Sequence, residues 1–389
     1  MSGWEPPPVT SLYVHVPFCA QKCRYCAFYS EAAEGALVNR YVGALIAELE
    51  LIADALQPRT IFFGGGTPSL LNLRQWERVL QAMERLHLLT AQEWTVECNP
   101  ATVSLDKAKL LRSAGVTRIS MGVQSLNEAL LDRLGRVHSR EMVFKSFDIL
   151  RAAGFDNLNV DLMFAIPGQT RAVWRQTLSE ALALESEHLS CYEIIYEEDT
   201  PLFAQLRAGA FDVDEDLSCE MYDELLERTE ARGLHQYEIA NFARSGSGSP
   251  GELPDHACGH NVNYWRGGSF HGLGPGATGY ARGVRTKNLA NTIRYCEEIE
   301  RGRRAIDFRE ELPSLVRAGE TAAFGLRMNA GWPFDQFQER TGHDLRQEWA
   351  REMDQLAARG WGRIEADRFR LTPQGLRFAD AAAEQFLRL

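Results

Sequence analysis

The sequence predicts an α/β protein, an incomplete (β/α)6 barrel followed by a mostly helical, winged-helix-like domain. Three observations favour this fold. Short apolar runs rich in β-branched residues alternate with longer amphipathic stretches over the first half of the chain, as in parallel strand–helix units. Unusual polar residues and glycines follow the apolar runs, and in βα barrels chemistry collects at the carboxyl ends of the strands. Beyond about residue 310 the pattern changes to helices and one β-hairpin.

Six strands and six helices are expected in the barrel, joined by right-handed connections. The expected strands are Leu12–Val16, Thr60–Phe63, Trp94–Cys98, Arg118–Met121, Leu158–Phe164 and Leu189–Ile195. The amphipathic stretches between and after them are Asn39–Leu56, Leu73–His87, Leu105–Ser113, Asn127–Leu134, Glu141–Ala153 and Arg171–Leu184.

The rest of the chain predicts a domain division into residues 1–200, 201–310 and 311–389. The middle part has a charged helix near Glu215–Arg232, a Gly/Ser-rich surface loop at Arg244–Gly251 and a glycine-rich turn or sheet corner at Gly272–Gly279. In the last part the expected elements are helices at Ala318–Leu326, Phe334–Thr341, Leu345–Arg359 and Pro373–Leu387, and strands at Ile364–Glu365 and Phe369–Leu371.

Composition narrows the class of partner. The 389 residues carry a formal charge of −11 and the pI is near 5.4, so nucleic acid is not an expected partner and membrane contact is at most peripheral. For the same reason the winged-helix-like domain favours packing or partner docking over DNA binding. No apolar run approaches the ~18 residues of a membrane span. Met1–Val9 is polar and proline-rich, unlike a secretory leader. Eight cysteines without a leader indicate a reducing compartment, so we expect a cytoplasmic protein.

Three cysteines lie close together on the loop after the first expected strand. Cys19, Cys23 and Cys26 have spacings of three and two intervening residues. Three thiolates can hold three irons of a 4Fe-4S cluster and leave the fourth iron open to another ligand. Two alternatives stay open: a zinc site completed by His15, and three unrelated buried thiols.

The ends of the following strands also carry polar residues and glycines. The second strand is followed by the turn Gly64–Pro68, whose backbone N–H groups can approach a ligand closely. Glu97 ends the third strand, Gln124 follows the fourth, and Asp161 lies in the fifth. One acid or amide at a strand end is often only a helix cap, but several at successive strand ends indicate a binding site.

These residues together resemble the HemN/HemW branch of the radical S-adenosylmethionine superfamily, over nearly the whole length of the chain. The resemblance implies a radical SAM barrel with a 4Fe-4S cluster on Cys19, Cys23 and Cys26, and S-adenosylmethionine chelated by the open iron. Arg136 would pair with the carboxylate of the cofactor, unless it is a solvated charge at a surface helix end. The positions that match the cofactor pocket of that branch are Tyr13, Tyr25, Gly65, Gly66, Thr67, Glu97, Gln124, Arg136 and Asp161.

Phe28 distinguishes the two kinds of protein within the branch. The oxygen-independent coproporphyrinogen oxidases have a fourth cysteine two residues after the last cluster ligand, where this chain has Phe28. The resemblance therefore puts oxidase activity in doubt. A phenylalanine at this position can also be explained by packing beside the cluster.

A second group of residues indicates a haem site. His256 and Cys258 are followed by the run His260–Trp265, and imidazole, thiolate and aromatic side chains all suit a haem. The run resembles the His-Asn-x-x-Tyr-Trp motif of the HemW haem chaperones. We therefore expect haem to contact His260, Tyr264 and Trp265. Cys258 is the rival axial ligand, and the weaker candidates are His256 and His271.

Three classes of function remain open on the sequence alone. The first is a haem chaperone that carries a cluster and S-adenosylmethionine and delivers haem to an acceptor, which the resemblance suggests is a respiratory enzyme. The second is an enzyme: a coproporphyrinogen oxidase, or a radical methylase or cyclopropanase on the same scaffold. The third is a regulatory protein with the cluster as redox sensor. The resemblance also suggests a flavodoxin-like electron donor.

Overall fold

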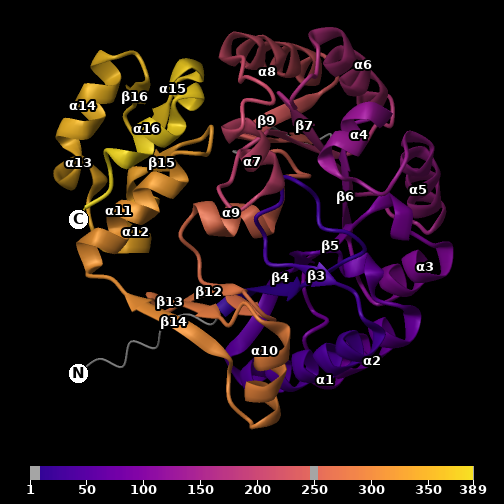
Figure 1. Ribbon diagram of the computed structural model, residues 1–389. Coiled ribbons are helices and arrows are strands. Elements are labelled where there is room, and N and C mark those ends of the chain that lie inside the picture. The colour runs from indigo at the N-terminus through magenta and orange to yellow at the C-terminus, as the bar shows by residue number, and fades with distance from the viewer. Residues whose placement is uncertain (1–8, 246–252, 389) are drawn as a thin grey trace, which may run out of the picture.

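The central element of the computed structural model, which describes residues 9–245 and 253–388, is a curved sheet of nine strands (Figure 1). Its order is β11-β1-β4-β5-β6-β7-β8-β10-β9, and the run from β1 to β8 is parallel throughout. All six expected strands are present, and the incomplete barrel is confirmed. They are β1 (Val9–Val16), β4 (Leu56–Gly65), β5 (Glu93–Cys98), β6 (Arg118–Gln124), β7 (Leu158–Phe164) and β8 (His188–Glu193).

Six α-helices cover the outer face of these strands (Figure 1). Side-chain caps fix several of their starts, as Asn72 does for α2 in a capping box. The first helix ends earlier than expected, because the chain passes through a 3-10 turn and Leu56 already belongs to β4. The helices are α1 (Gly35–Ile52), α2 (Leu73–Arg85), α3 (Leu105–Ser113), α4 (Glu128–Leu134), α5 (Arg140–Ala152) and α6 (Arg171–Leu182).

The middle part of the chain extends the sheet at both edges. β10 (Asn241–Arg244) pairs antiparallel with β8 and with β9 (Leu234–Glu238), and β11 (His271–Leu273) pairs parallel with β1. The expected turn or sheet corner at Gly272–Gly279 runs from within β11 through the connecting turn into β12 (Thr278–Ala281). The three-domain division therefore stays a prediction. Residues 1–8 and 246–252, with most of the expected Gly/Ser loop, lie outside the described residues. The other elements here are β2 (Phe18–Cys19), β3 (Glu31–Ala32), α7 (Pro201–Arg207), α8 (Glu215–Glu230), α9 (Gly259–Trp265), β13 (Val284–Asn288), α10 (Thr292–Glu300) and β14 (Ile306–Glu311).

The C-terminal part packs around its own core of aromatic side chains, with Trp332, Phe337, Trp349, Phe369 and Phe386 all buried. Helix α11 (Ser314–Gly325) precedes a sheet of order β15-β17-β16, which confirms the winged-helix-like arrangement. Two expected helices are each split in two, because Trp349 and Phe378 leave the helical φ range. The remaining elements are β15 (Trp332–Pro333), α12 (Phe334–Thr341), α13 (Leu345–Glu348), α14 (Ala350–Ala358), β16 (Gly362–Ile364), β17 (Arg368–Leu371), α15 (Pro373–Arg377) and α16 (Ala379–Glu384).

The barrel strands have one apolar and one polar face. Phe63 and Val96 belong to the core that packs against the helices. The next residues in sequence, Gly64 and Glu97, lie on the opposite face, because successive residues in a strand alternate between faces. Asp161 on β7 lies on this second face as well. The interior of the barrel is therefore lined largely by polar groups. Among the described residues, no helix is both long and apolar enough to cross a membrane.

The two faces predict different costs of substitution at two phenylalanines. Phe63 is buried between Trp76 and Trp94, with ring centroids 5.2 and 5.9 Å away. Phe63→Ala should lower the free energy of unfolding by about 3–5 kcal/mol, because it leaves a cavity in the outer core. Phe28→Ala makes the same change at an exposed site and should cost less than about 0.5 kcal/mol. Urea titration measures both, and equal losses would contradict the assignment of Phe63 to this core.

Candidate functional site

A cavity of about 680 Å³ opens at the carboxyl ends of the barrel strands. Because parallel strands end at the same side of the sheet, residues from loops far apart in sequence meet there. The cavity brings together nearly all of the residues expected at the cluster and cofactor site. Those in its wall are Cys19, Cys23, Cys26, Tyr25, Gly65, Gly66, Thr67, Glu97, Gln124, Arg136 and Asp161.

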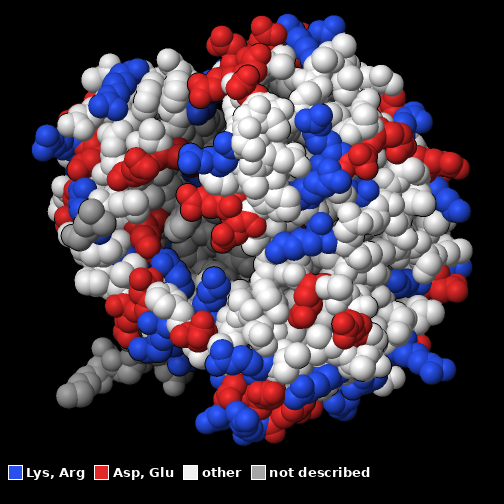
Figure 2. All heavy atoms as spheres, viewed as in Figure 1, with Lys and Arg blue, Asp and Glu red and all other residues white. Residues whose placement is uncertain are grey.

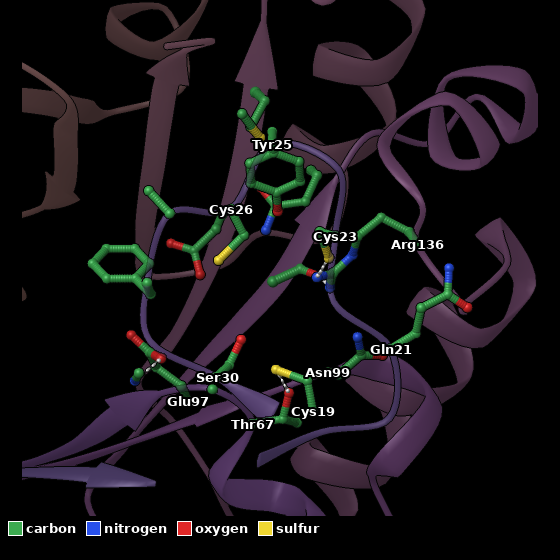
Figure 3. Close-up of a pocket in the computed structure, with 18 of the residues that line it drawn as sticks. Cys19, Gln21, Cys23, Tyr25, Cys26, Ser30, Thr67, Glu97, Asn99 and Arg136 are labelled. Carbon is green, nitrogen blue, oxygen red and sulfur yellow. Dashed lines mark hydrogen bonds between the residues drawn. The ribbon is translucent and has the colours of Figure 1, made fainter. Parts of the chain in front are cut away.

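The three cysteine side chains point into this cavity from one loop (Figure 3). Thr67 Oγ1 donates to Cys19 Sγ over 3.6 Å, and Arg136 Nη1 donates to Cys23 Sγ over 3.5 Å. Burial raises the pKa of Cys19 and Cys26, so both thiols keep their protons when no metal is bound. Iron binding would stabilise the thiolates, and the donor set therefore suits an iron–sulfur cluster.

The zinc alternative does not agree with the contacts of His15. Its Nδ1 is 3.0 Å from the Tyr13 hydroxyl and its Nε2 is 2.8 Å from the Tyr29 carbonyl oxygen, so neither nitrogen is free. Within the described ranges, no group of three His, Cys, Asp or Glu side chains is placed to hold one metal ion. Thiols that each bind a different iron of a cluster need not converge on one point. Three cysteines in one cavity wall also argue against unrelated buried thiols.

The glycine turn after β4 allows two backbone segments to approach closely. Gly65 has a φ of +99°, and a Cβ on Gly66 would lie 2.6 Å from the Val16 carbonyl oxygen and 2.8 Å from the Phe18 nitrogen. A side chain on Gly66 would force the turn away from the start of the cysteine loop, and one on Gly65 would overlap the His15 ring and strain the backbone. Gly65 N also donates to Glu97 Oε2 over 3.1 Å, which joins the turn to the end of β5.

Two half-buried carboxyl groups, Glu97 and Asp161, give the cavity its electrostatic character. Burial, reinforced by the nearby charge of Asp161, raises the pKa of Glu97 to about 8. Burial also raises the pKa of Asp161, although hydrogen bonds from Asn159 Nδ2 (2.8 Å) and Ser120 Oγ (3.0 Å) favour its ionised form. A cationic ligand would stabilise both carboxylates, so this part of the cavity suits a positively charged group.

Arg136 lies in the cavity wall rather than at a solvated helix end, so the surface interpretation is wrong. Its Nη2 donates to the Gly122 carbonyl oxygen over 2.5 Å. Its Nε is buried and has no hydrogen-bond partner among the described residues. Arg136 thus keeps one buried donor free beside Cys23, and this donor could receive a carboxylate.

Tyr13 is the one expected cofactor residue that does not line the cavity. Its hydroxyl contacts His15 Nδ1, and its ring centroid is 6.2 Å from that of Phe62. Its side chain therefore lies in the barrel interior, at some distance from the cysteine loop. Tyr25, by contrast, lies on that loop and in the cavity wall.

The rim of the cavity is apolar and exposed. Phe28 is 68% exposed and Ile195 is 67% exposed, and both line the cavity. Phe28 therefore packs little against the protein itself, and its packing beside a cluster stays a prediction. Several wall residues were not among those expected from the sequence, including Asn99, Ser120 and Ile195. Strand alternation could have indicated Ser120, which shares a face with Asp161, but no local signal marks Ile195.

The segment expected to bind haem forms α9, near the amino ends of the strands. His260 is buried, with Nδ1 2.9 Å from Thr60 Oγ1 and Nε2 2.7 Å from the Tyr264 hydroxyl. Burial and the charge of Arg118 lower the pKa of His260 to about 3. In this conformation His260 has no free nitrogen for a haem iron, contrary to the expectation from its sequence. Cys258 is fully buried as well, with its Sγ 3.6 Å from Glu93 Oε1.

Other groups around α9 are more open. Trp265 lies against Phe324 of α11, with ring centroids 6.5 Å apart, and Arg327 stacks over its ring at 4.6 Å. Figure 2 shows a hollow between the C-terminal domain and the barrel, where Figure 1 places α9. His271 is half-buried and its Nε2 has no partner among the described residues. His256 lines a separate, acidic cavity of about 470 Å³.

Comparison with known proteins agrees with this geometry. The sequence model of the radical SAM superfamily matches residues 13–181, and that of the HemN C-terminal domain matches residues 312–378. The heme chaperone HemW of Bacillus subtilis is 35% identical over 94% of this chain and 96% of its own length. That of Escherichia coli is 33% identical over 98% of both chains.

One relative and one solved structure extend the comparison. The mitochondrial radical S-adenosyl methionine domain-containing protein 1 of Danio rerio is 34% identical over 82% of this chain and 73% of its own. The structure of coproporphyrinogen III oxidase (HemN) from Escherichia coli superimposes with a TM-score of 0.83, covering 99% of this chain and 91% of that one. Its sequence identity is 21%, so this likeness concerns the fold alone.

The raised pKa of Glu97 predicts that it destabilises the ligand-free protein as the pH rises. Its pKa is about 8 in the folded chain, against an ordinary value of about 4.3 in the unfolded chain. Between these values the folded state keeps a proton that the unfolded chain releases, so the free energy of unfolding falls as pH increases. Glu97→Gln should remove up to about 4 kcal/mol of this fall between pH 5 and 8.

Urea titrations across this pH range on cluster-free protein provide the measurement. Glu193→Gln is the matched control, because Glu193 lines the same cavity but is exposed. Its stability profile should run parallel to that of the parent. If Glu97→Gln also ran parallel, Glu97 would be ionised throughout and the charge assignment in the cavity would be wrong.

Proposed function

Because this chain belongs to the HemW family of radical SAM proteins, we propose that it is a haem chaperone that binds haem, one 4Fe-4S cluster and S-adenosylmethionine and delivers haem to an acceptor protein. The observation that carries the proposal is the similarity of this chain to proteins named heme chaperone HemW, which extends over nearly the full length of both sequences. The intact cavity with its three thiols supports the cluster and cofactor part.

Each group in the cavity has a role in this proposal. Cys19, Cys23 and Cys26 would hold the cluster, and a bound cluster would supply one-electron chemistry beside the cofactor. The free donor of Arg136 receives the cofactor's carboxylate, and the turn at Gly65–Thr67 accommodates its amino group. Glu97 and Asp161 accept hydrogen bonds from its hydroxyls and offset its positive charge. Tyr25 and Gln124 complete the wall.

Haem binding is assigned to the region of α9, which carries His260, Tyr264 and Trp265. Because both nitrogens of His260 are hydrogen-bonded, the imidazole must leave Thr60 and Tyr264 before it can bind iron. The free energy of these two bonds then lowers the affinity for haem. The hollow beside α9 in Figure 2 offers a route to this segment.

The proposal does not include coproporphyrinogen oxidation, because Phe28 stands where the oxidases of this branch have a cysteine. A cytoplasmic location, a haem-dependent respiratory enzyme as acceptor and a flavodoxin-like electron donor extend the same proposal. They rest on the resemblance to the family, and the acidic composition supports the absence of nucleic acid as a partner.

The first test concerns the cluster. Under anaerobic reconstitution the parent should bind about four irons per chain with the visible absorption of a 4Fe-4S centre. Cys19→Ala, Cys23→Ala and Cys26→Ala should each lose it. Cys98→Ala is the matched control, because Cys98 is buried in the same cavity wall and should be dispensable. Full iron and sulfide content in any of the first three variants would contradict the assignment of that cysteine as a cluster ligand.

A second test asks which histidine binds haem. Tyr264→Phe keeps the aromatic ring but frees His260 Nε2, so it should tighten haem binding about threefold to tenfold if His260 is the ligand. His260→Ala should lose the Soret shift. His271→Ala, which removes the imidazole with an unpartnered Nε2, is the control and should bind haem as the parent does.

Spectroscopic titration of haem into each purified variant gives the affinities. Loss of binding only in His271→Ala would keep the function and move the ligand to the edge strand β11. A parent spectrum that remained that of free haem would overturn the chaperone proposal.

A further inference from the structure

A chain of buried polar groups crosses the barrel interior from the cofactor cavity to α9. Asp161 lines the cavity, and Asn159 lies two residues earlier on the same face of β7. Asn159 Oδ1 is 2.6 Å from His188 Nδ1, and His188 Nε2 is 2.8 Å from the Tyr237 hydroxyl. The Tyr237 hydroxyl in turn accepts a hydrogen bond of 3.1 Å from the backbone N–H of Cys258. Cys258 is the N-cap of α9.

Every hydrogen bond in this series is donated in the direction that leads from α9 to Asp161. The Asn159 amide donates from Nδ2 to Asp161 and Ser120, so its Oδ1 accepts from His188, whose proton therefore lies on Nδ1. A neutral imidazole with its proton on Nδ1 accepts on Nε2, so the Tyr237 hydroxyl donates to His188 and accepts from the Cys258 N–H. The Asn159 amide donates to Asp161 Oδ1 over 2.8 Å. One direction of donation is thus fixed from α9 to the carboxylate.

A second, shorter branch reinforces this direction. Asn159 Nδ2 also donates to Ser120 Oγ over 2.7 Å, and Ser120 Oγ donates to Asp161 Oδ2 over 3.0 Å. Both oxygens of Asp161 therefore accept hydrogen bonds from side chains of this relay. Ser120 lines the cavity as well, so the cavity end of the relay is held by two side chains.

His188 can serve in this chain because it stays neutral. It is fully buried, and burial together with the charge of Arg118 places its pKa well below the ordinary value. A neutral imidazole has one donor and one acceptor, which is what a directed chain requires. The mutual polarisation of successive hydrogen bonds makes the bond at one end depend on the charge at the other.

We propose that this chain of hydrogen bonds couples the cofactor cavity to α9, with Asn159, His188 and Tyr237 as positioning residues that act through Asp161. The inference rests on the proposed function, because Asp161 is assigned there to S-adenosylmethionine. When the cofactor binds, its cationic group and hydroxyls interact with Asp161. This changes the strength of the hydrogen bonds that Asp161 accepts from Asn159 and Ser120. The change is transmitted through the relay and alters the strength of the hydrogen bond from the Cys258 N–H to Tyr237, which stabilises the first turn of α9.

Hydrogen–deuterium exchange of α9 tests the coupling without reference to haem. In the cluster-loaded parent, saturating S-adenosylmethionine should change the exchange rate of amides at Cys258–Trp265 by about fivefold or more. Tyr237→Phe removes the hydroxyl in the middle of the relay, keeps the aromatic ring that packs near α9, and lies outside the cavity wall. In this variant the cofactor should still bind but should leave the exchange of α9 unchanged.

Tyr295→Phe is the matched control, because it deletes an equally buried hydroxyl that donates to Glu48 outside the relay. It should keep the response of the parent. Asn159→Ala, which breaks the relay beside Asp161, should abolish the response as Tyr237→Phe does and gives a second test if the first variant does not fold. The inference would be overturned if either relay variant kept the exchange response of the parent, or if Tyr295→Phe lost that response.

The affinities provide a reciprocal measurement. Binding coupling is symmetric, so S-adenosylmethionine should change the dissociation constant of haem by the same factor as haem changes that of S-adenosylmethionine. That factor should fall to about one in Tyr237→Phe. A parent that binds S-adenosylmethionine without any change in α9 exchange would refute the coupling alone. A parent that does not bind S-adenosylmethionine at all would refute the proposed cofactor site, and the coupling with it.

Discussion

The alternation of apolar and polar residues along the barrel strands is the constraint on which the rest of this structure depends. Side chains such as Phe63 face the helices and form the large core, while Glu97, Asp161 and His188 face the barrel interior. A buried polar group without a hydrogen-bond partner is costly, so the interior groups must bond to one another or to a ligand. This requirement produces both the relay through the interior and the free donor of Arg136 in the cavity.

The same constraint provides a physical connection for the proposed coupling between the cavity and α9, which lie toward opposite ends of the strands. An apolar barrel interior would insulate one end from the other. Here Asn159, His188 and Tyr237 fill it with directed hydrogen bonds. At the barrel edge, buried Glu48 accepts from Gly274 N and from the Tyr295 hydroxyl, and so fixes the turn after β11. The segment that follows α9 is therefore joined to the barrel as well.

Local sequence patterns were sufficient for the six strands, the covering helices and most of the cavity wall. Cys19, Cys23 and Cys26 are close in sequence, and the glycines and acids at strand ends meet because parallel strands align their ends. Sequence reasoning failed for His260, whose bonds to Thr60 and Tyr264 depend on how α9 packs into the barrel. It also failed for strands β9 to β11, because β10 and β11 join the sheet through β8 and β1, which lie far away in sequence.

By itself, the sequence determined the fold class, the family and the grouping of three cysteines on one loop, because these depend on residue types at short spacings and on the period of strands and helices. The tertiary structure decided which of those residues have free atoms. Whether a nitrogen of His260, a donor of Arg136 or the face of Phe28 is open to a ligand depends on neighbours from distant segments. Those neighbours are brought close only when the chain buries its apolar face, so no local pattern records them.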